Sequence, residues 1–111
     1  MLARIYHLTV AQFRKNPNPV TRASSSLFGL LIKISKSKTV RFVIIIPKRL
    51  DKRSTYRNQT KRIITEILNS IIPKMTLKYE IWLQAKKILN RKEKTEVEVQ
   101  LLKLFKQLNL I

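Results

Sequence analysis

The chain has 111 residues, 24 Lys and Arg against 6 Asp and Glu, and a formal net charge of +18 at pH 7. A charge of this size indicates a polyanionic partner, either nucleic acid or an anionic membrane surface. Hydrophobic residues make up 44% of the chain, which excludes a disordered basic tail and predicts a packed core. The length suits one domain, so we expect residues 1–111 to form a single folded unit.

The sequence contains no Cys, which excludes disulfides, thiolate zinc sites and cysteine nucleophiles. Residues 1–10 lack the apolar run of a secretory signal, and the longest apolar run, 42–47, is far shorter than the ~20 residues that span a bilayer. We therefore expect a cytoplasmic protein with no membrane partner. Charge alone leaves one alternative open, a protein that binds a membrane surface.

The first predicted element is a short helix. Thr9 is a suitable N-cap with Gln12 three residues later, the spacing of a capping box. Leu8 and Phe13 then occupy the two positions of a hydrophobic staple. The helix should end at Asn16, because a following proline disfavours helical geometry.

Two strands are predicted next. Residues 27–34 form a largely apolar run, in which Gly29, the only Gly of the chain, indicates a bulge or a close backbone approach. The polar residues 35–39 have the length of a hairpin loop. Residues 40–46 are rich in β-branched side chains. The period of two places one set of their side chains on one face and the other set opposite: Val40, Phe42, Ile44 and Ile46 against Arg41, Val43 and Ile45.

A helix is predicted over 55–72, with Pro73 ending it, followed by a half-buried strand over 79–85. The apolar face of that helix should consist of Tyr56, Thr60, Ile63, Ile64, Ile67, Leu68 and Ile71. A last helix follows the basic loop 86–94, with Thr95 and Glu98 as its capping box. Its apolar stripe is Val97, Leu101, Leu104, Phe105 and Leu108.

These elements predict an α+β fold, a two-layer α–β sandwich. The order is helix, strand, strand, helix, strand, helix, with a further short strand around 20–22. Helices should cover one face of a single sheet and leave its other face open.

The titratable residues do not form a catalytic or metal-binding pattern. Asp51 is the only Asp, the five Glu residues are scattered, and no spacing typical of a metal site occurs. His7 is the only His and is interpreted as a surface or packing residue. With one Gly there is no glycine-rich phosphate loop. We therefore expect no catalytic residue and no metal ligand in this chain.

The densest charge lies in residues 48–62, where seven of fifteen residues are basic and one is acidic. These cations continue from a strand end into a helix N-terminus, where backbone N–H groups and the helix dipole add to the positive potential. Arg57, Lys61 and Arg62 share one arc with Asn58. Guanidinium and amide groups in this arrangement suit RNA, because they bond phosphates in a fork and stack on bases.

Residues 42–49, the run 56–62 and Glu66 together resemble the protein subunit of bacterial ribonuclease P. That family has an apolar strand ending in basic residues and a helix opening with Arg-Asn and continuing to Lys-Arg. The other predicted elements follow in the order of the family. The chain departs from the family pattern at Gln59, Thr65 and Pro17, where the family usually has Arg, Arg and Phe.

The resemblance implies a sandwich of the type of the second domain of ribosomal protein S5, with an unusual left-handed βαβ crossover. It implies a protein that binds a catalytic RNA and the 5′ leader of precursor tRNA, with Mg²⁺ acting through the RNA and none bound by the chain alone. No protein partner is required. The residues that it assigns to RNA binding are Arg57, Asn58, Lys61, Arg62, Lys48, Arg49, Lys52 and Arg53. The candidates for the leader cleft are Phe13, Arg14 and Phe28.

Two other function classes stay open at this stage. A ribosomal or other structural RNA-binding protein would have the same size, charge and fold class. A basic membrane-surface protein would need an exposed amphipathic helix, whereas the predicted strands need the apolar face of helix 55–72 for a core.

Overall fold

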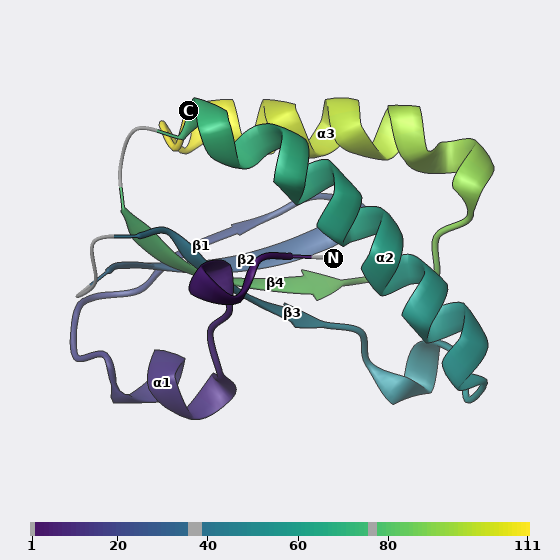
Figure 1. Ribbon diagram of the computed structural model, residues 1–111, viewed down its shortest axis with the longest axis horizontal. Coiled ribbons are helices and arrows are strands. Elements are labelled where there is room, and N and C mark those ends of the chain that lie inside the picture. Colours follow the sequence, from purple (N-terminus) through teal and green to yellow (C-terminus); the bar gives the residue numbers. More distant parts are fainter. Residues whose placement is uncertain (1, 36–38, 76–77) are drawn as a thin grey trace.

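The computed structural model describes residues 2–35, 39–75 and 78–111. Its helices and strands follow the predicted order, and the short strand expected around 20–22 is present as β1 (Figure 1). Short 3₁₀ turns at Arg4–Tyr6, Lys48–Leu50, Ile72–Lys74 and Arg91–Glu93 flank them. The elements are α1 (Val10–Lys15), β1 (Thr21–Ser24), β2 (Phe28–Ile34), β3 (Arg41–Ile45), α2 (Ser54–Ile71), β4 (Tyr79–Ala85) and α3 (Lys94–Gln107).

The four strands form one sheet in the order β1-β2-β4-β3. β1 pairs with β2 and β2 with β4 in antiparallel fashion, whereas β3 runs parallel to β4. The predicted hairpin between β2 and β3 is therefore wrong, because β4 lies between them; residues 36–38 of its loop lie outside the described residues. β3, α2 and β4 form the βαβ unit to which the resemblance assigns the left-handed crossover.

α2 and α3 cover one face of the sheet, and α1 lies on the other (Figure 1). The covered face supplies Phe28, Leu30 and Ile32 from β2 and Phe42 from β3, all of them buried in the main core. Val43 instead belongs to a second, smaller cluster on the opposite face. The alternation predicted for residues 40–46 is thus confirmed.

α2 buries the face that the sequence predicts, with one exception. Thr60 and the isoleucine and leucine residues of that face are buried, but Tyr56 is 40% exposed. The helix ends at Ile71, and the chain passes through a 3₁₀ turn that contains Pro73. α2 therefore extends along the core while its first turn reaches beyond it into solvent.

α3 begins differently from the prediction. The capping box does not involve Thr95 and Glu98 but lies one turn earlier: the Asn90 side chain accepts a hydrogen bond from the Lys92 backbone N–H, and Glu93 accepts one from that of Asn90. The chain turns earlier because Asn90 has an extended backbone and a side chain short enough to cap. The apolar stripe is confirmed, with Val97, Leu101, Leu104 and Phe105 buried and Leu108 half-buried.

Gly29 produces neither a bulge nor a close backbone approach. It pairs in regular register with Ser24 on β1 and Gln84 on β4. A Cβ atom placed on it would meet no atom within 4 Å, and its φ angle is not positive. Both predictions made for Gly29 are therefore wrong, and the space above it is open.

α1 has the predicted local structure. The Thr9 hydroxyl accepts a hydrogen bond from the Gln12 backbone N–H at 3.1 Å, and the Gln12 side chain accepts one from the Thr9 N–H at 2.9 Å. Leu8 and Phe13 both pack in the second cluster with Val43. The staple thus fixes α1 against the face of the sheet that α2 and α3 leave uncovered.

Candidate nucleic-acid interface

The first candidate surface is the arc at the start of α2. Asn58, Lys61 and Arg62 are exposed, and none of them is in an ion pair within the described residues. Arg57 is half-buried, and its Nε is buried without a hydrogen-bond partner. The structure therefore brings three of the four predicted side chains together in solvent and partly buries the fourth.

The arc ends one turn later. Thr65, where the resemblance leads to an Arg, is buried, and its hydroxyl donates a hydrogen bond to the Lys61 carbonyl at 2.8 Å. Glu66 pairs with Arg91, which precedes α3. The cationic part of α2 is thus confined to its first half.

The connection before α2 carries the other predicted cations. Lys48, Arg49 and Lys52 are exposed. Arg53 is engaged within the chain: it bonds both carboxylate oxygens of Asp51, at 3.0 and 2.9 Å, and its guanidinium lies 4.1 Å from the centre of the Tyr56 ring. This hydrogen bonding lowers the pKa of Asp51 below its ordinary value and raises the pKa of Arg53. Asp51 thus compensates one of the seven cations before any ligand binds.

The second candidate surface is a hollow of about 750 Å³ on the sheet face opposite the main core. Leu31, Trp82 and Gln84 contribute its floor together with Gly29, whose missing side chain leaves room above the strand. Three exposed cations line it as well: Arg22, Arg49 and Lys86. A flat aromatic and amide floor with a cationic rim suits a single-stranded nucleic acid, which offers bases to stack and phosphates to neutralise.

For Trp82 the sequence favours a position in the core, whereas the structure places it at the hollow, on the sheet face opposite the main core. It lies on β4 with its ring centre 5.7 Å from that of Phe13, and its indole N–H donates to the Gln84 side chain at 3.3 Å. The alternation of residues 79–85 does show that the Trp82 side chain lies on the opposite face of the strand from Ile81 and Leu83. Which of the two faces is open was not visible in the sequence.

The three leader-cleft candidates have different positions. Phe13 is buried between α1 and the sheet, next to Trp82. Arg14 is exposed on α1 but does not line the hollow. Phe28 is completely buried in the main core on the other face, so its prediction as a cleft residue is wrong. The Phe28 side chain lies on the face of β2 that packs in the main core, together with Leu30 and Ile32.

In the part of the chain that the structure describes, no three His, Asp or Glu side chains form a group that could hold a metal ion. No helix among the described residues is long and apolar enough to cross a membrane.

A four-stranded sheet, two helices on one face, a short helix on the other and a cationic junction before α2 define a small, strongly basic α+β protein. Within that class the chain belongs to the ribonuclease P family, whose sequence model matches residues 8–109. It is therefore a component of a tRNA-processing hydrolase, and its family implies association with ribonuclease P RNA. A search of curated proteins finds no match.

Solved structures of the family share the fold. The ribonuclease P protein of Staphylococcus aureus superposes with a TM-score of 0.75 at 19% identity, over 95% of this chain and 96% of the other. A mutant of that protein, described as defective in mRNA degradation, gives 0.78 at 18% identity over 97% and 92%. The protein of Thermotoga maritima gives 0.63 at 19% identity over 86% of each chain.

Proposed function

We propose that this chain assists an RNA catalyst in removing the 5′ leader from precursor tRNA in the cytoplasm. The start of α2 binds the catalytic RNA subunit, and the hollow on the sheet receives the leader. The bond is cut by the RNA with Mg²⁺, and this chain supplies binding and charge compensation. The observation that carries the proposal is the exposed arc of Asn58, Lys61 and Arg62 in the first half of α2 in a member of this family.

The arc suits RNA for electrostatic reasons. Arg57 lies in the first turn of α2, where the positive end of the helix dipole repels a cation, so a polyanion that binds beside it relieves the repulsion. α2 begins without a side-chain N-cap, which leaves backbone N–H groups of its first turn available for phosphate oxygens. Lys61 contributes a point charge, and Arg62 can bond a phosphate in a fork.

The hollow suits a single-stranded leader because it combines an aromatic ring, on which an unpaired base can stack, with cations that can neutralise phosphates. Gly29 and Leu31 leave a shallow floor beside the Trp82 ring, and stacking on an aromatic ring is tolerant of base identity. Arg22 and Lys86 stand at the rim, within reach of a phosphate backbone that crosses the floor. Arg49 lines the hollow and also belongs to the junction before α2, so the two surfaces are continuous.

The test is reconstitution with a bacterial ribonuclease P RNA and a precursor tRNA that carries a leader. At low Mg²⁺ the unaltered chain should raise cleavage above that of the RNA alone. The double variant Lys61→Ala, Arg62→Ala should weaken binding to the RNA at least tenfold, because two charge-assisted contacts are lost. The matched control is Lys103→Ala with Lys106→Ala, two exposed lysines on α3 that change the net charge equally.

Cleavage that is the same with and without the chain would refute the proposal. Co-sedimentation with ribosomes, in place of binding to one catalytic RNA, would favour the alternative of a structural RNA-binding protein. Equal losses for the α2 and α3 double variants would show that only total charge matters.

A further inference from the structure

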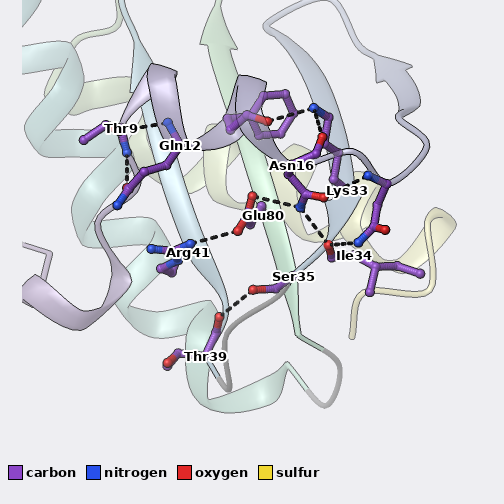
Figure 2. A network of polar contacts seen from close by, with 11 residues as sticks. Thr9, Gln12, Asn16, Lys33, Ile34, Ser35, Thr39, Arg41 and Glu80 are labelled. Carbon is purple, nitrogen blue, oxygen red and sulfur yellow. Dashed lines mark hydrogen bonds and ion pairs between the residues drawn. The ribbon is translucent and has the colours of Figure 1, made fainter.

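α1 has only six residues, and an isolated helix of that length is not stable in water. Its position on the sheet therefore depends on contacts outside the helix. Leu8 and Phe13 provide apolar contacts with Val43 in the second cluster. The C-terminal end of α1 is held by a polar network that centres on Asn16, which is itself buried (Figure 2).

The network starts from a row of three charged residues across the sheet. Lys33 on β2 and Arg41 on β3 are the register partners of Glu80 on the central strand β4. Glu80 is only 2% exposed. The Arg41 guanidinium pairs with its Oε2 at 2.8 Å, which leaves Oε1 to accept a hydrogen bond from the Asn16 side-chain amide at 3.0 Å.

Asn16 uses its whole side chain to join α1 to this row. Its amide nitrogen also donates to the Ile34 carbonyl at 2.9 Å, and its amide oxygen accepts from the Asn18 backbone N–H at 2.9 Å. The Lys33 ammonium donates to the carbonyls of Phe13 and Asn16, at 2.7 and 2.9 Å. These carbonyls lie at the helix end, where a cation is electrostatically favourable.

The Lys33 ammonium also lies 4.4 Å from the centre of the Phe13 ring, which in turn contacts Trp82. The Phe13 side chain thus connects the polar network to Trp82, which lines the hollow. A buried carboxylate and amide would be unnecessary if α1 needed only to adhere to the sheet, since apolar side chains could do that. Directional hydrogen bonds fix one geometry, and this is the property that a binding surface requires.

We propose that Asn16, anchored on Glu80, is a positioning residue that sets the height of α1 over the sheet and thereby the contact of Phe13 with Trp82. This inference rests on the proposed function, because it takes the hollow beside Trp82 as the site of the precursor-tRNA leader. Asn16 does not touch the hollow. It acts on leader binding through α1 and Phe13.

The first test uses the free, full-length protein and the variant Asn16→Ala. Trp82 is the only Trp of the chain, so its emission reports directly on the contact with Phe13. The variant should show red-shifted emission and faster amide hydrogen exchange over residues 10–15, with the cooperative unfolding of the main core retained. The matched control is Asn18→Ala, since Asn18 bonds the same Ile34 carbonyl but does not contact Glu80.

The second test adds ribonuclease P RNA. Affinity for precursor tRNA with a leader should fall about tenfold in Asn16→Ala, while affinity for mature tRNA and for the RNA subunit stays unchanged. Lys33→Met, which removes the ammonium but keeps most of its stem, should act in the same direction and serves if Asn16→Ala does not fold.

Unchanged Trp82 emission and amide exchange in both variants would overturn the positioning role, as would a displaced α1 with unchanged leader affinity. If the unaltered chain shows no leader-dependent affinity at all, the proposed function fails. The emission and exchange data would in that case still report whether Asn16 positions α1.

Discussion

At the scale of single residues, the missing side chain of Gly29 contributes to the shape of the hollow on the sheet. Gly29 has no conformational reason to be a glycine, since its φ is not positive, and no packing reason, since a Cβ would meet nothing within 4 Å. A side chain at this position would project into the hollow next to Gln84. Under the proposed function, the absence of a side chain leaves this space to the leader.

Replacing Gly29 by Val should change the affinity for leader-bearing precursor tRNA without lowering the free energy of unfolding. Val favours strands and loses less backbone entropy than Gly, so Gly29→Val should raise or preserve the free energy of unfolding, by up to about 1 kcal/mol. The branched side chain should obstruct the hollow, and affinity for leader-bearing precursor tRNA should fall about tenfold or more. Denaturant unfolding and binding titrations measure the two effects.

The control for this experiment is Leu31→Val. Leu31 lies on the same face of β2 as Gly29, but this substitution makes the side chain smaller, so it does not obstruct the hollow. Leader affinity that is unchanged in Gly29→Val would mean that the ligand does not approach this part of the sheet.

At the scale of elements, α2 and α3 begin in different ways. α2 begins without a side-chain cap, and its first turn is exposed. α3 has no side-chain cap of its own but follows the capped turn at Asn90. The loop before that turn is anchored to α2, because the buried Thr60 hydroxyl accepts a hydrogen bond from the Leu89 backbone N–H at 3.0 Å.

The capping box at Asn90 predicts that two alanine variants differ in their free energy of unfolding. Asn90→Ala removes the side chain that accepts from the Lys92 N–H, so it should lower the free energy of unfolding by about 1 kcal/mol. Thr95→Ala, at the position that the sequence pattern favours, should change it by less than about 0.5 kcal/mol, because Thr95 is exposed and does not cap the helix. Urea unfolding of both variants measures this difference. A larger loss for Thr95→Ala would contradict the structure at the start of α3.

At the scale of the whole molecule, the charge of +18 is distributed between a concentrated part and a general background. Residues 48–62 contain seven cations, of which Arg53 is compensated by Asp51. Arg22 and Lys86 add a second group around the hollow, and Arg49 belongs to both. Arg49 therefore links the cations that precede α2 to those around the hollow on the sheet.

The salt dependence of RNA binding measures how much of this charge is used. Each neutralised phosphate contributes about 0.7–0.9 to the slope of log K against log salt concentration. Lys61→Ala with Arg62→Ala should reduce the slope by about 1.4–1.8, whereas Lys103→Ala with Lys106→Ala on α3 should leave it nearly unchanged. Titrations at several KCl concentrations provide the measurement. The same reduction in both double variants would indicate attraction without a defined contact surface.

The sequence predicts those features that depend on local patterns. The capping box at Thr9, the faces of α2 and β3 and the arc of Asn58, Lys61 and Arg62 follow from spacing alone. The position of β4 between β2 and β3 does not, because strand order is set by long-range packing that no local pattern encodes. For the same reason the sequence favoured the core for Trp82, and the resemblance placed Phe28 among the candidates for the leader cleft.

The central position of β4 also has a consequence for synthesis of the chain. A ribosome delivers β3 long before residues 79–85, so β3 has no partner strand until β4 is made, and β2 is paired on one edge only, with β1. Strands in that state are prone to pair with other chains. The acquisition of structure is thus limited by contacts between distant parts of the sequence, which predicts slow folding for a protein of this size.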